Sequence, residues 1–96
     1  MNREQFTKSL DAVYPPSGLD EYLSALWYDA KGNWEDAHKI IQDIPGAKAS
    51  RIHGYLHRKE GDSGNAAYWY AKAGEPMPRT ALAKEWEDIL VKLLDP

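Results

Sequence analysis

Two of the three histidines in this chain lie one helical turn apart. His53 and His57 are separated by four positions, and Glu60 continues the same line. On a helix, residues at this spacing project from one face. Two such imidazoles can bind one metal ion, and imidazole can also transfer protons near neutral pH. The segment around these histidines is therefore where we look first for a functional site.

The third histidine, His38, is expected to face the same interior region, because it stands beside Ala37 and Ile41 on the apolar side of its segment. The sequence suggests a polar pocket with five members: Tyr28, His38, His53, His57 and Glu60. Three interpretations remain open. The first is a structural network, because buried polar groups must be paired. The others are a pocket for a small polar or anionic ligand and a metal site, whose ligands would include His53 and His57.

Other catalytic chemistry finds little support. The chain contains no cysteine, which excludes a thiolate metal site and a cysteine nucleophile. Its serines have ready roles as helix caps or surface residues, and the segment 61–64 is typical of a helix cap and turn rather than of a phosphate-binding loop. We assign no catalytic residue and no cofactor. An enzyme is the less favoured class, and catalysis enters only as an alternative role of the histidine pocket.

A second candidate site is basic. Arg51 and Arg58 are two helical turns apart in an acidic chain of net charge −3, and Tyr22 and Tyr55 occupy equivalent repeat positions. Guanidinium groups match carboxylates, so these four residues could bind an extended or helical peptide that carries acidic groups. The alternative is a solvated face whose ion pairs contribute little to stability.

An internal repeat indicates the fold that must position these residues. The segments 26–33 and 55–62 both end in glycine followed by Asn or Asp, and the offset from Gly32 to Gly61 is 29 residues. An alanine follows each at the same distance, at Ala37 and Ala66. Self-similarity at such a period predicts stacked helical hairpins.

Local signals divide the chain into helices and suggest no strand. The pair Pro15-Pro16 ends a first helix, and we expect Ser17 with Asp20 to begin the next. The prediction is a single all-α domain over residues 1–96, with two stacked hairpins between capping helices at the two ends of the chain. Their approximate bounds are 19–44 and 47–74 for the hairpins, and 2–13 and 79–94 for the terminal helices.

One segment carries a family resemblance. Residues 65–73, Asn-Ala-Ala-Tyr-Trp-Tyr-Ala-Lys-Ala, resemble the second helix of a Sel-like repeat. Gly61, Ala66, Tyr70 and Ala73 also fall on the tetratricopeptide pattern, although the period is shorter than the ~34 residues of that repeat. Residues 27–62 are also similar to a group of small bacterial proteins without an assigned activity. The resemblance implies a right-handed helical array that acts as a scaffold, and not a reaction.

The favoured function is therefore a non-enzymatic interaction module that binds a protein or peptide partner through the Tyr/Arg face. Self-association is a further alternative, and the pocket around His38, His53 and His57 is the runner-up. The net charge gives no general attraction to nucleic acid or acidic membranes. No apolar run is long enough to suggest a signal peptide or a membrane span, so we expect a cytoplasmic protein.

Overall fold

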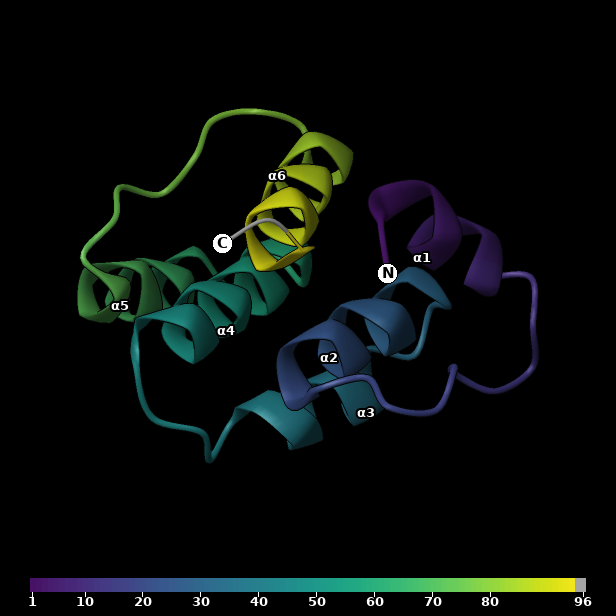
Figure 1. Ribbon diagram of the computed structural model, residues 1–96. Helices are drawn as coiled ribbons and strands as arrows, with labels where there is room; N and C mark the ends of the chain where they lie inside the picture. Colours follow the sequence, from purple (N-terminus) through teal and green to yellow (C-terminus); the bar gives the residue numbers. More distant parts are fainter. Residues whose placement is uncertain (95–96) are drawn as a thin grey trace.

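The computed structural model describes residues 1–94, and every regular element among them is an α-helix (Figure 1). This confirms the all-α class. The helices in chain order are α1 (Arg3–Ser9), α2 (Glu21–Ala30), α3 (Trp34–Ile41), α4 (Ala47–Lys59), α5 (Ser63–Ala73) and α6 (Leu82–Leu94). The terminal helices are shorter than expected: α1 ends at Ser9 rather than near residue 13, and α6 begins at Leu82 rather than at residue 79.

Side-chain caps and glycines set the helix ends. Asp20, Asn33 and Asp62 each accept a hydrogen bond from the backbone N–H three residues further on, which satisfies a donor that the helix itself leaves unpaired. Gly32 and Gly61 have φ values of 82° and 88°, which a residue with a Cβ adopts only under strain. The repeated Gly-Asn and Gly-Asp pairs thus form the short turns between α2 and α3 and between α4 and α5.

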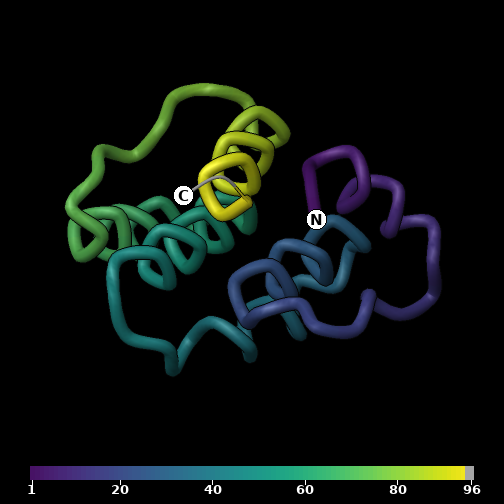
Figure 2. The backbone as a smooth tube through the Cα atoms, viewed as in Figure 1, coloured from purple at the N-terminus to yellow at the C-terminus, as the bar shows by residue number. Residues whose placement is uncertain are grey.

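The helix α4 is at the centre of the molecule. It packs most extensively on α5 and also contacts α2, α3 and α6, while α2 packs on α3. The last helix, α6, lies against α1, α2 and α4 (Figure 1). Figure 2 shows the chain leaving α5 and reaching α6 through an extended loop, residues 74–81. As a result, α6 covers the side on which α2 and α4 lie next to each other.

The core is built from the inward faces of these helices. Its largest apolar side chains, buried almost completely, are Phe6, Leu26, Trp27, Ile41, Ile52, Leu56 and Leu90. Gly54 allows α4 and α5 to pack closely, because a Cβ at this position would lie 3.0 Å from Cδ2 of Tyr70 on α5. Its repeat counterpart, Ala25, is also fully buried. Small residues thus occupy equivalent positions of the two repeat units.

Across residues 1–94 no helix combines the length and the apolar character that crossing a membrane would need.

Candidate functional site

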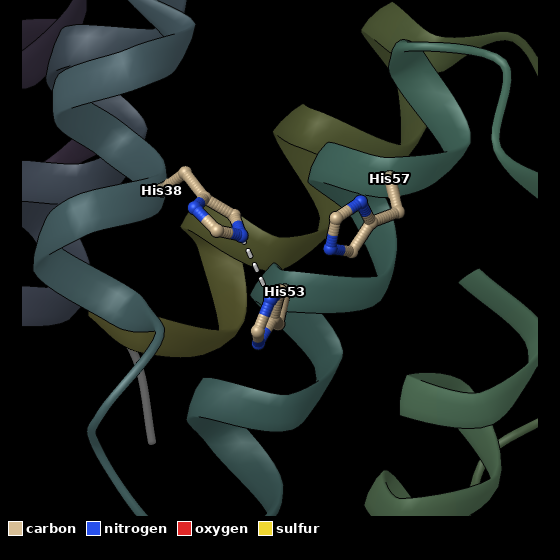
Figure 3. Close-up of side chains that lie close together, drawn as sticks. All are labelled: His38, His53 and His57. Atoms are coloured by element: carbon tan, nitrogen blue, oxygen red, sulfur yellow. Dashed lines mark hydrogen bonds between the residues drawn. The ribbon is translucent and has the colours of Figure 1, made fainter. Parts of the chain in front are cut away.

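The structure brings the three histidines together from two helices. Figure 3 shows the His38 ring projecting from α3 toward the His53 and His57 rings of α4. Nε2 of His38 lies 3.0 Å from Nε2 of His53, so one of these nitrogens donates and the other accepts. Each of the three rings offers one nitrogen, and these nitrogens all lie within 4.8 Å of one another.

Two tryptophans hold the imidazole planes. The Trp34 ring stacks on His38 at 4.8 Å and 9°, and the Trp69 ring stacks on His53 at 3.9 Å and 19°. The indole N–H of Trp34 also donates to the Leu56 carbonyl at 2.8 Å, which ties α3 to α4 next to the cluster. With rings on both sides, the imidazoles have little freedom to turn away from one another.

A carboxylate orients the third imidazole. Nδ1 of His57 lies 2.7 Å from Oε1 of Glu60, so Nδ1 donates in this contact and Nε2 is the nitrogen left for another partner. No hydrogen bond within residues 1–94 reaches that Nε2. Metal-binding histidines commonly use this arrangement, in which the nitrogen away from the ion donates to a carboxylate.

Burial keeps the His38 and His53 imidazoles in the form that binds metals. The pKa of His53 is lowered to about 4 by burial and, secondarily, by the neighbouring His38 and His57 rings. The pKa of His38 is also lowered, mainly by burial and next by His57. His53 and His57 are only 5% and 7% exposed, whereas His38 is half-buried and leaves the cluster a route to solvent. At neutral pH, His53 and His38 are therefore uncharged and hold lone pairs.

The spacing is close to that of a metal site. In a tetrahedral zinc site the ligand nitrogens lie about 3.3 Å apart, given bonds of about 2.0–2.1 Å. The 3.0 Å separation of the His38 and His53 nitrogens is close to this value, and the His57 nitrogen, within 4.8 Å of both, would need to approach them by up to about 1.5 Å. Three protein ligands leave a fourth position for water or a further ligand. A second acidic group, His57 with Glu60 and Asp62, is less suitable because Asp62 caps α5.

The structure brings together four of the five residues predicted to form the polar pocket. His38, His53, His57 and Glu60 meet, whereas Tyr28 packs edge-on against Trp27 at 5.4 Å. No hydrogen bond or ring contact in the described part of the chain joins Tyr28 to the histidines. Sequence reasoning overlooked both tryptophans. Trp34 could have been found from its position four residues before His38, which places the two rings on one helix face.

Each residue of the Tyr/Arg face has a partner within the chain. Tyr55 is only 2% exposed, and its hydroxyl donates to Oδ2 of the buried Asp29 at 2.8 Å. Nζ of Lys59 lies 3.0 Å from the other carboxylate oxygen of Asp29. Tyr22 lies beneath the ammonium of Lys48, 5.8 Å from Nζ to the ring centre.

The two arginines of this face also have partners. Arg58 donates to Oε1 of the buried Glu85 at 2.8 Å and to the Thr80 carbonyl, and the Tyr70 hydroxyl donates to Oε2 of Glu85. Arg51 pairs with Glu75, with Nε 3.2 Å from Oε2. Since Glu85 belongs to α6, the chain itself supplies an acidic helix to the face that was expected to bind one. Binding of an external partner there stays a prediction.

Comparisons with protein-family models, with curated proteins and with solved structures gave no match to this chain. Its function has to be argued from the geometry of its own residues.

Proposed function

We propose that this protein binds one transition-metal ion through the imidazoles of His38, His53 and His57. The observation that carries the proposal is the convergence of three imidazole nitrogens within 4.8 Å at a buried position. Two further features support it. The pKa values of His38 and His53 are lowered, so few protons compete with an ion at neutral pH, and Glu60 orients His57 from behind.

The ligand set favours a particular group of ions. Imidazole suits Zn²⁺, Cu²⁺ and Ni²⁺, whereas Mg²⁺ and Ca²⁺ prefer oxygen ligands. Imidazole ligands carry no negative charge, so the charge of the ion would be balanced by its fourth ligand and by Glu60, which is hydrogen-bonded to His57. We expect Zn²⁺ or Cu²⁺ to bind and Mg²⁺ not to bind.

A purely structural histidine network is the competing explanation. It accounts for the His38–His53 hydrogen bond, and it accounts for Glu60 as an ordinary partner of His57. It leaves Nε2 of His57, which has no hydrogen bond among residues 1–94 and is not fully buried, to be paired by solvent. An ion at the centre of the cluster would use this nitrogen.

The test is metal binding by the purified chain after treatment with a chelator. Isothermal titration with Zn²⁺, Cu²⁺, Ni²⁺ and Mg²⁺, with thermal unfolding in parallel, should give one ion per chain and a raised Tm for the first three ions only. His53→Phe should abolish binding while the chain stays helical by circular dichroism. Asp62→Asn is the matched control, because it keeps the helix cap and removes only the alternative acidic group. Absence of binding by the folded parent, or equal binding by His53→Phe, would refute the metal site.

The scaffold supports a second inference of a structural kind. We infer that α2–α3 and α4–α5 form a short array related to tetratricopeptide repeats. The 29-residue offset, the equivalent glycine turns and the packing of α2 on α3 and of α4 on α5 support it. In such an array the metal site would lie between consecutive hairpins, since His38 comes from the first and the other two histidines come from the second.

A further inference from the structure

A cavity of about 420 Å³ lies on α4 apart from the histidines, between the first turns of α4, the end of α5 and the last turns of α6. Its volume falls in the range of small-molecule sites. Its apolar lining includes Ile52 from α4 and Ile89 and Leu93 from α6. No residue of the metal site lines it, so this cavity is a separate feature.

The polar part of the cavity is predominantly cationic. Lys48, Arg51 and Lys92 line it together with a single carboxylate, Glu75. Glu75 is shared, since one oxygen lies 3.2 Å from Nε of Arg51 and the other lies 3.7 Å from Nζ of Lys92. The lining therefore keeps an excess of positive charge. The first turn of α4 carries no acidic residue, and its N-cap, Gly46, provides no side-chain cap. The partial positive charge of this helix end adds to the positive charge of the lining.

Arg51 is the group on which the argument rests. Its side chain is 16% exposed, and its buried Nε has no hydrogen bond in the described part of the chain, because the approach of Glu75 is an ion pair without hydrogen-bond alignment. Leaving a buried donor unpaired is costly, more so for a charged group. A guanidinium group has five N–H donors and binds carboxylates in a fork geometry. Arg51 thus retains donor capacity at an apolar cavity.

We propose that this cavity binds a small amphipathic carboxylate, such as a free medium-chain fatty acid. The carboxylate would accept hydrogen bonds from Arg51 and gain from Lys48 and Lys92, while the hydrocarbon chain would lie against Ile52, Ile89 and Leu93. The positive charge of the lining favours an anion, and the apolar side chains favour an anion with a hydrocarbon chain. This proposal is independent of the metal site.

The test compares octanoate, decanoate and octanol by ¹⁵N–¹H NMR titration of the parent chain. We expect both acids to shift amide resonances of residues around the cavity, and decanoate to bind more tightly, by up to roughly fourfold for each additional buried methylene. Octanol, which has a similar tail and no charge, should bind at least roughly tenfold more weakly than octanoate. The affinities should not change when a chelator is present. Failure of either acid to bind, or equal affinity for octanol, would overturn the proposal.

Two variants locate the carboxylate. Arg51→Gln should weaken octanoate binding at least roughly tenfold, whereas Lys84→Gln, which removes an exposed cation elsewhere on α6, should leave it unchanged. If Arg51→Gln does not fold, Lys92→Gln replaces it, because that side chain is largely exposed and its loss should still weaken binding several-fold. Unchanged octanoate affinity after the loss of these cavity cations would show that the site is elsewhere and would overturn the proposal.

Discussion

Two polar regions lie on opposite sides of α4, and they are paired in different ways. On one side, the buried carboxylates of Asp29 and Glu85 each receive one tyrosine hydroxyl and one cation. On the other side, the imidazoles of His38, His53 and His57 lie against one another. His38 pairs with His53, and His57 pairs with Glu60.

Under the proposed function, this difference separates a structural network from a metal site. A buried carboxylate is tolerated only when its charge is compensated and its lone pairs are used, and both conditions are met within the chain at Asp29 and Glu85. The pKa values of His38 and His53 are lowered, mainly by burial, and Nε2 of His57 has no hydrogen bond among the described residues. We therefore expect changes in the carboxylate networks to alter stability, and changes in the histidine cluster to alter binding.

The strongest test of this contrast is Glu85→Ala. The substitution leaves Arg58 and Tyr70 without their shared carboxylate, and removing one partner of a buried pair costs about 3–5 kcal/mol in the free energy of unfolding. Urea denaturation followed by circular dichroism measures the loss. Metal affinity of the fraction that remains folded should match the parent. A change below about 1 kcal/mol would mean that the network contributes little.

The histidine cluster should make the metal-free protein sensitive to acid. The pKa of His53 is about 4 in the folded state and about 6.5 when unfolded, so the unfolded chain binds more protons between these values. The contribution of uncharged His53 to the free energy of unfolding is therefore complete above pH 6.5. It declines as the pH falls toward 4, by about 3 kcal/mol in total. Urea unfolding at a series of pH values measures this slope. His53→Phe, which retains a ring against Trp69, should show a smaller slope; an unchanged slope would assign the effect to other groups.

Gly54→Ala tests the helix contact between the two regions. The new Cβ would lie 3.0 Å from the Tyr70 ring, which is packed in the core and bonded to Glu85, so the ring cannot move freely. Overpacking costs about 1–3 kcal/mol, and the better helix propensity of alanine returns up to about 1 kcal/mol. We expect a net loss of about 1–2 kcal/mol by thermal or urea unfolding. A variant as stable as the parent would show that α4 and α5 can separate without loss.

The smallest effect on stability is expected for Glu60→Gln. Glu60 is partly exposed, so the metal-free variant should unfold within about 1 kcal/mol of the parent. Its zinc affinity should nevertheless fall 10- to 100-fold, the usual effect of losing a carboxylate behind a histidine ligand. Titration calorimetry and urea unfolding of the same preparation give both numbers. Loss of stability with unchanged affinity would reverse the proposed roles.

Much of the fold could be predicted because its signals are local. The effect of Gly32 and Gly61 depends on their own backbone conformation, and the capping residues after them bond only to the first turn of the following helix. Both interhelical turns lie where the repeat predicts them. The predicted start of α2 at Ser17 was wrong. The Asp20 side chain accepts the Leu23 N–H, and the helix therefore begins at Glu21.

The candidate site was predictable where local patterns set the direction of a side chain. His53 and His57 share α4 and Glu60 is its C-cap residue, so their meeting follows from spacing. The neighbours Ala37 and Ile41 indicated that His38 faces inward from α3. The contact of Trp69 with His53 depends on how α5 rests on α4, and the burial of Glu85 depends on how α6 crosses α4. No local pattern in the sequence encodes either arrangement.

The position of α6 has a consequence for any partner of the face formed by α2 and α4. The helix is joined to the rest of the chain through the short connection 74–81, and a segment tethered this way has an effective concentration on the order of millimolar. A free acidic helix of equal intrinsic affinity, present at about a micromolar concentration, would displace it in roughly one molecule in a thousand. Recognition at this face would thus be a competition with the chain's own last helix, and a successful competitor would need contacts beyond those made by α6.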